Sequence, residues 1–130
     1  MQAHKESIKP GAVFVKERTY SRDEVRDFAS ISRDDGVHHR VEDARGRLMV
    51  HGLLTVALAT EIGGDLDYIA GQMLLNFVRP VFTGDTVRCE VRIDSVVEEP
   101  GRLLLQMTVT ARNQHGKEVV TGTSSGVILR

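Results

Sequence analysis

The sequence has little cysteine, few aromatic residues and no long apolar run. Its single cysteine, Cys89, excludes an intrachain disulfide. Four Phe, two Tyr and no Trp argue against a platform of aromatic side chains for stacking nucleic-acid bases. No apolar stretch approaches the ~20 residues that span a bilayer, and the polar first residues contain no hydrophobic signal core. We therefore expect a cytoplasmic protein that binds neither nucleic acid nor membrane.

An excess of charge of either sign is also missing. Lys and Arg number 17 and Asp and Glu number 18, which gives no electrostatic reason to expect a polyanionic partner. The 130 residues, of which 41% are apolar, suit one globular domain that needs no disulfide or metal to fold. We expect a loose polar arm over residues 1–10, a single domain over residues 11–130, and no cofactor. A domain with so few bulky side chains has little room for a deep ligand site of its own.

The first part of the domain is predicted to be a strand followed by a helix. Residues 12–20 are typical of a short strand. Ser21 and Glu24 then form a capping-box pattern, in which each side chain accepts a hydrogen bond from the backbone of the other. Helical spacing predicts one narrow buried face, made of Val25, Phe28, Ala29 and Ser32.

The middle of the chain combines its most polar segment with its most apolar one. Residues 33–50 carry two Asp, two His and a charged run, which predicts a long irregular loop of the kind that is often functional. Residues 52–63 are apolar on nearly every side, so we expect one helix that other elements enclose.

The remaining residues are predicted to be strands. Apolar and polar residues alternate with a period of two, most regularly around Cys89, and turns separate the segments 71–79, 86–97, 103–111 and 118–129. An antiparallel sheet with one apolar face needs a partner for that face. The simplest architecture is an α+β domain in which a curved antiparallel sheet wraps around the helix at 52–63.

Candidate chemical groups gather in and beside the loop. His38, His39 and His51 lie near Asp34 and Asp35, and a His with a nearby carboxylate suits proton transfer around neutral pH. An unreactive polar surface is an equal alternative at this point. Imidazole and carboxylate also bind metals, but no helical H-x-x-x-H pair is present. Because the adjacent side chains of His38 and His39 are expected to diverge, we predict no metal site.

A second candidate feature is the glycine at the start of the apolar helix. In Val50-His51-Gly52, the unpaired N–H groups of the helix start suit a developing negative oxygen, and glycine allows close approach. A tight turn into the helix is the alternative. Cys89 is predicted to be a core residue and not a nucleophile. The sequence contains no P-loop or dinucleotide-binding motif.

Four segments of the chain resemble motifs of one enzyme family. Residues 28–39 (FASISRDDGVHH) resemble F-A-x-L-S-G-D-x-N-P-x-H, and residues 50–54 (VHGLL) resemble V-H-G-M-L. Residues 77–87 (FVRPVFTGDTV) resemble F-x-x-P-V-x-x-G-D-x-L, and residues 119–122 (VVTG) resemble the last strand of the same family. The family is that of the MaoC-like hot-dog dehydratases. Gly36 and Val37 stand where the motif has Asn and Pro, and Arg33 stands where it has Gly.

The resemblance implies a hot-dog fold and a reaction. Members reversibly hydrate 2-enoyl thioesters of coenzyme A or acyl carrier protein. By correspondence, Asp34 and His39 would hold the catalytic water, and Gly52 would donate its N–H to the thioester oxygen. A further set of residues would bind substrate: Ser32, Gly36, His38, Val50 and His51. The resemblance also implies a homodimer or a higher even oligomer, with the site at the subunit interface.

Two other functions remain open for a hot-dog chain with these residues. One is a thioesterase, in which Asp34 or Asp35 would activate water against the thioester carbonyl. The other is a non-catalytic subunit that binds acyl groups or supports an active partner. Arg33, Arg40, Arg45 and Arg47 either contact a phosphate of the carrier or form a solvated charged surface.

Overall fold

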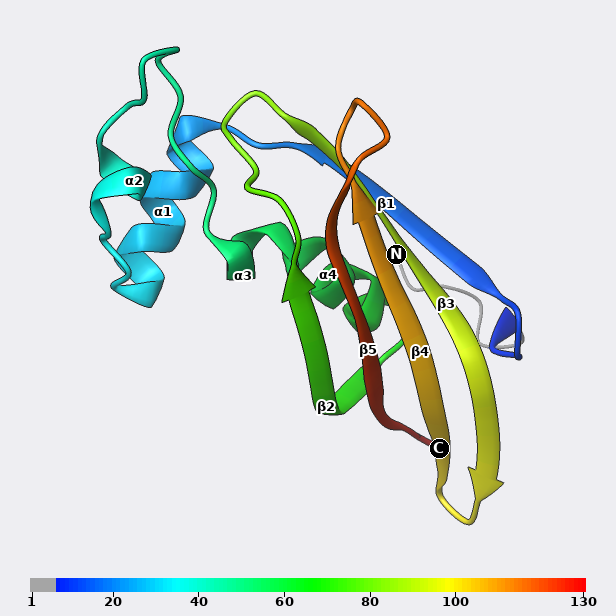
Figure 1. The fold of residues 1–130 in the computed structure, drawn as a ribbon. Helices are drawn as coiled ribbons and strands as arrows, with labels where there is room; N and C mark the ends of the chain where they lie inside the picture. Colours follow the sequence, from blue (N-terminus) through cyan, green and yellow to red (C-terminus); the bar gives the residue numbers. More distant parts are fainter. Residues whose placement is uncertain (1–6) are drawn as a thin grey trace.

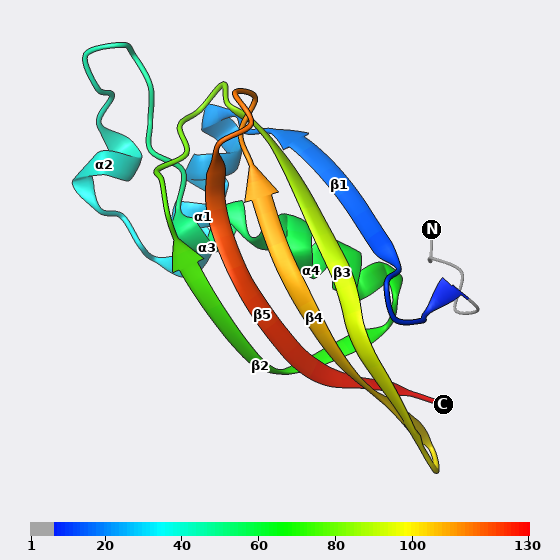
Figure 2. The same ribbon diagram turned by 45° about the vertical axis from the view of Figure 1, so that its right-hand side comes forward.

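The computed structural model describes residues 7–130 as one antiparallel sheet with helices on one side and at one end (Figure 1). The elements in chain order are β1 (Val13–Thr19), α1 (Arg22–Ser32), α2 (Val37–Arg40), α3 (Gly52–Thr55), α4 (Ala57–Asp65), β2 (Tyr68–Phe77), β3 (Thr86–Glu99), β4 (Arg102–Arg112) and β5 (Glu118–Leu129). The strand order is β1-β3-β4-β5-β2. The sheet curves around α4, as Figure 2 shows, so the predicted α+β hot-dog architecture is confirmed.

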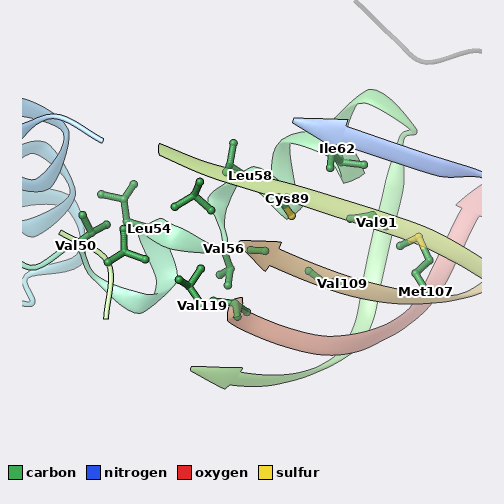
Figure 3. Packing of buried hydrophobic residues seen from close by; sticks show 14 of the residues in the cluster. Val50, Leu54, Val56, Leu58, Ile62, Cys89, Val91, Met107, Val109 and Val119 are labelled. Atoms are coloured by element: carbon green, nitrogen blue, oxygen red, sulfur yellow. The ribbon is translucent and has the colours of Figure 1, made fainter. Parts of the chain in front are cut away.

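The core forms where the alternating strands face the helix. On β4, and on β3 from Val87 to Ile93, every second residue is buried, and these inward residues include Val91, Met107 and Val109. Opposite them lie Leu58 and Ile62 of α4, as Figure 3 shows. Two ion pairs hold the helix to the edge of the sheet, because Lys16 of β1 lies 3.3 Å from Glu61 and 3.1 Å from Asp65.

The apolar helix expected over 52–63 is interrupted at Val56. The N–H of Ala59 donates to the carbonyl of Val56, three residues back, and the carbonyl of Thr55 instead accepts the buried hydroxyl of Tyr20 at 3.0 Å. The Thr55 hydroxyl donates to the carbonyl of His51 at 3.0 Å, a back-bond of the kind that bends helices. The period of the sequence predicted the helix, but these tertiary and side-chain contacts divide it into α3 and α4.

The first helix follows the prediction except at its last residue. Ser21 caps α1 and forms the expected capping box with Glu24. Val25 is fully buried and Phe28 and Ala29 are only partly buried, whereas Ser32 is exposed and does not belong to the buried face. The reason is that α1 ends there: Arg33 adopts φ 63° and its N–H donates to Ala29 at 2.8 Å, which turns the chain away from the helix axis.

The polar segment 33–50 is less irregular than predicted. It contains the short helix α2, and beyond it Asp43 accepts the backbone N–H groups of Arg45 and Arg47, each at 2.9 Å. Its last residues form a β-bridge between Met49 and Phe82. The other strands differ little from the prediction in their bounds. For example, β2 covers Tyr68–Phe77 where a strand over 71–79 was expected.

The remaining features of the fold are the start of the chain and the exposed apolar residues at the β2 edge and on α3. The predicted arm at residues 1–10 lies mostly outside the described residues, and Ile8 packs against the core. Among the described residues, strand β2 pairs only with β5, and its exposed residues include Ile69, Leu74 and Phe77, which are 53%, 62% and 53% exposed. Leu53 of α3 is 62% exposed, so the protomer does not fully enclose its apolar helix. Within residues 7–130, no helix has the length and apolarity to cross a membrane.

Candidate active site

Asp34 and His39 come together where the chain passes from α1 into α2. These two helices lie at one end of the sheet (Figure 1). The Oδ2 atom of Asp34 lies 3.6 Å from Nε2 of His39. The imidazole is 5% exposed, whereas the carboxylate is 58% exposed. One face of the pair is therefore buried and the other is open to a small molecule.

The hydrogen bonds of His39 fix which of its nitrogens is free. Its Nδ1 lies 2.7 Å from the carbonyl oxygen of Met49, and because a carbonyl only accepts, Nδ1 carries the proton. The N–H of Met49 in turn donates to the carbonyl of His38 at 2.9 Å, which ties this segment to α2. In the neutral ring, Nε2 is left as an acceptor that faces the carboxylate of Asp34.

Asp34 is held from both sides along the chain. Its N–H donates to the hydroxyl of Ser32 at 3.1 Å, and its Oδ1 accepts the N–H of Gly36 at 3.3 Å. The left-handed turn at Arg33 directs the chain into this position. Ser32 and Gly36, both predicted to bind substrate, thus contact Asp34 in the structure.

His51 lies behind the pair. Its ring stacks on that of His39, with centroids 3.6 Å apart and planes at 15°, and its other neighbour is Phe28, edge-on at 4.9 Å. The Nε2 of His51 donates to the carbonyl of Asp34 at 2.9 Å. His51 is only 2% exposed, because the stacked ring of His39 covers its side chain. This burial differs from the direct contact with substrate that we expected.

His38 packs beside His39. The expectation that His38 and His39 diverge is wrong, since their ring centroids lie 4.0 Å apart, at the one-turn helix α2. A Cβ atom on Gly36 would lie 3.0 Å from Cε1 of His38. The glycine that replaces the motif Asn therefore leaves the space that this ring occupies.

The same residues were also considered as metal ligands. Asp34, His39 and His51 each offer an atom within 4.8 Å of the others. However, the two rings are nearly parallel, so their in-plane lone pairs run side by side and do not converge on one ion. His51 also already uses Nε2 to donate to Asp34. The arrangement suits proton transfer better than metal binding.

A groove of about 290 Å³ connects His39 with the start of α3. Gly52 lies in it, and the ring of Phe77 covers this glycine so closely that a Cβ on Gly52 would lie 2.7 Å from Cε1 of Phe77. The predicted substrate residues His38 and Val50 also line the groove. The full lining is His38, His39, Met49, Val50, Gly52, Thr55, Phe77, Val78, Arg79, Pro80 and Val120.

One residue near the site was not predicted from the sequence, and several residues considered in the sequence have other partners in the structure. Phe77 belongs to a motif segment, but nothing in that pattern indicated contact with Gly52. Asp35 lies 3.8 Å from Nε of Arg40. Arg47 pairs with Asp43. Cys89 is buried, and this burial raises the pKa of its thiol to about 11, as expected for a core residue.

Comparison with known proteins decides the family. Residues 11–122 match the model of the FAS1-like dehydratase domain region. The chain belongs to this family of dehydratase domains. No curated protein sequence matches it.

Solved structures similar to this dehydratase domain are hot-dog proteins of the MaoC-like type. The (R)-hydratase from A. caviae involved in PHA biosynthesis is 28% identical, with a TM-score of 0.84 over 96% of this chain and 99% of that one. R-hydratase PhaJ1 from Pseudomonas aeruginosa is 22% identical, with a TM-score of 0.83 over 96% and 84%. The HadBC (3R-hydroxyacyl-ACP dehydratase) complex from Mycobacterium tuberculosis is 19% identical, with a TM-score of 0.75 over 91% and 96%. The last two similarities concern the fold alone.

Proposed function

We propose that this dehydratase domain reversibly adds water to 2-enoyl thioesters, with Asp34 and His39 as the acid–base pair and Gly52 as the oxyanion donor. The supporting observation is the pairing of Nε2 of His39 with Oδ2 of Asp34 at 3.6 Å, beside a groove that also contains Gly52. The family match and the similarity to (R)-hydratases point to the same chemistry.

The geometry of the pair suits a water molecule that is held by its protons. Nε2 of the neutral His39 and the carboxylate of Asp34 are both acceptors, and 3.6 Å is too long for a direct hydrogen bond. A water between them donates one proton to each group. Its oxygen lone pairs then face the open side, where the double bond of a substrate would lie.

In the proposed reaction, this water adds across the double bond of the enoyl group. The water oxygen bonds to C3 of the enoyl group while one of its protons passes to the acid–base pair. The electrons of the double bond move toward the thioester oxygen, and the pair returns one proton to C2. The product is the 3-hydroxyacyl thioester, and dehydration is the same path reversed.

Gly52 would stabilise the negative charge that develops on the thioester oxygen. As the first residue of α3, its N–H has no acceptor one turn back within the helix. The absence of a side chain lets a carbonyl approach the backbone. Losing such a donor typically lowers kcat by about 100-fold or more.

The rest of the groove would bind the thioester. Its lining is mixed and includes apolar Val50 and Phe77 together with polar His38 and Arg79. Ser32 and Gly36 would affect the substrate indirectly, because they hold Asp34 in place by hydrogen bonds. The carrier would be coenzyme A or acyl carrier protein.

The functional unit would be a homodimer. The β2 edge is unpaired and apolar, and an edge of this kind is usually covered. A second copy pairing at β2 would cover Leu74, and the nearby groove carries Phe77 from the end of the same strand. The site would then lie beside the interface.

A spectrophotometric assay of crotonyl-CoA hydration tests the proposal. Asp34→Asn and His39→Ala should each lower the rate by orders of magnitude, on the order of 100-fold at least. His115→Ala, in an exposed turn, is the matched control and should hydrate at the wild-type rate. Wild-type rates in both site variants would refute these roles, and release of free thiol without loss of the enoyl absorbance would instead indicate a thioesterase.

A further inference from the structure

The part of the site least explained by the proposed chemistry is His51. It is 2% exposed, yet it contacts both members of the acid–base pair: its ring stacks on His39, and its Nε2 donates to the carbonyl of Asp34. The two contacts come from one side chain at the residue before Gly52. A buried residue that touches two reacting groups without facing the groove can act only through them.

We propose that His51 is a positioning residue that sets the distance between Asp34 and His39, chiefly through its hydrogen bond to the carbonyl of Asp34. This inference rests on the proposed function of the pair. The hydrogen bond anchors the main chain of Asp34 from the side of the core, whereas Ser32, at the end of α1, and Gly36 hold Asp34 only from positions two residues away in the chain. The stacked ring gives His39 a flat surface that limits its tilt.

The hydrogen bonds also fix the protonation of the two stacked rings in opposite ways. His51 carries its proton on Nε2, because that atom donates to a carbonyl, while His39 carries its proton on Nδ1, for the same reason. Nδ1 of His51 is buried and has no hydrogen-bond partner in the part of the chain that the structure describes. A second proton on that ring would leave a charged N–H buried without an acceptor, which is costly. The hydrogen bonds thus give the two stacked rings opposite tautomers.

Two substitutions separate the hydrogen bond from the stacking. His51→Phe keeps an aromatic ring against His39 but loses the donor to Asp34. His51→Gln loses the ring but keeps an N–H donor at a similar distance from the backbone. His115→Phe, in an exposed turn, controls for the exchange of His for Phe.

In crotonyl-CoA hydration, His51→Phe should lower kcat by about 10- to 100-fold, since small displacements of reacting groups have effects of this size. Its KM should stay close to the wild-type value, because His51 does not contact the groove. His51→Gln should recover most of the lost kcat. A wild-type kcat in His51→Phe, a rise in KM alone, or equal losses in both variants would overturn the proposal.

A measurement on the wild-type protein keeps the inference testable if His51→Phe does not fold. Long-range proton–nitrogen NMR spectra of the imidazole rings should show His51 protonated at Nε2 and His39 at Nδ1. The reverse tautomer at His51 would overturn the proposal. Because this readout needs no substrate, it stands even if the wild-type protein lacks hydratase activity, which would contradict only the proposed function.

Discussion

The ring of Phe77, at the end of β2, lies directly over Gly52, at the start of α3. A Cβ on Gly52 would come within 2.7 Å of Cε1 and 3.0 Å of Cδ1 of that ring. The contact joins the exposed edge of the sheet to the backbone N–H that we assign to the oxyanion. Any side chain at residue 52 must displace the ring or fill the groove.

Gly52→Ala should therefore lower kcat/KM for crotonyl-CoA hydration by at least about tenfold, while the fold is retained because the half-exposed Phe77 can move. The matched control is Gly64→Ala, since a Cβ at that position in α4 meets no atom within 4 Å. The control should keep wild-type activity and stabilise the protein by about 0.5–1 kcal/mol, as Ala replaces Gly in a helix. Wild-type activity in Gly52→Ala would contradict the role assigned to this glycine.

The apolar β2 edge predicts how the protein assembles. Leu74→Glu places a charge where a second copy would pair, so the variant should run as a monomer in size-exclusion chromatography with light scattering. Val97 is similarly exposed, at 53%, but lies toward the β3–β4 hairpin, so Val97→Glu should remain a dimer. A wild-type monomer, or a Leu74→Glu dimer, would argue against pairing at β2.

Tyr20 should matter for stability because of the helix interruption at Val56. Its hydroxyl donates to the carbonyls of Leu54 and Thr55, both at 3.0 Å, inside the core. Tyr20→Phe leaves these buried acceptors without that donor and should lower the free energy of unfolding in urea by about 1–3 kcal/mol. Tyr68→Phe is the comparison, since its hydroxyl bonds Ser124 in a less buried position, and its effect should be smaller. Equal effects would contradict the larger contribution expected from the two hydrogen bonds of Tyr20.

The turn at Asp43 should make part of the stability depend on pH. The backbone N–H and guanidinium of Arg47 hold the pKa of the Asp43 carboxyl below its ordinary value of 3.8. Because the folded value is the lower one, the stabilisation is present above 3.8 and is lost as the pH falls through the folded value. The difference in unfolding free energy between wild type and Asp43→Ala should be constant near neutral pH and shrink in acid. A difference that does not change with pH would exclude this charge effect.

Local patterns in the sequence were sufficient for most of the secondary structure. The period of two around Cys89 predicted β3, and the capping box of Ser21 and Glu24 predicted the start of α1, because each depends on residues close together in the chain. The division of the helix at Val56 could not be predicted, since it depends on the hydroxyl of Tyr20, more than thirty residues away.

The candidate site could likewise be predicted only in part from the sequence. The motif pattern and its chemistry marked Asp34, His39 and Gly52 in the sequence. The spacing gave no reason for His51 to stack on His39, or for Phe77 to cover Gly52, because the rotation of an imidazole and the path of an edge strand depend on packing between distant segments. By itself, the sequence determined the fold class through local periodicity, and its motifs marked the residues that we propose as reacting groups. Only the tertiary structure decided which nitrogen faces the carboxylate and which residues hold the pair, because these follow from hydrogen bonds between segments that the fold brings together.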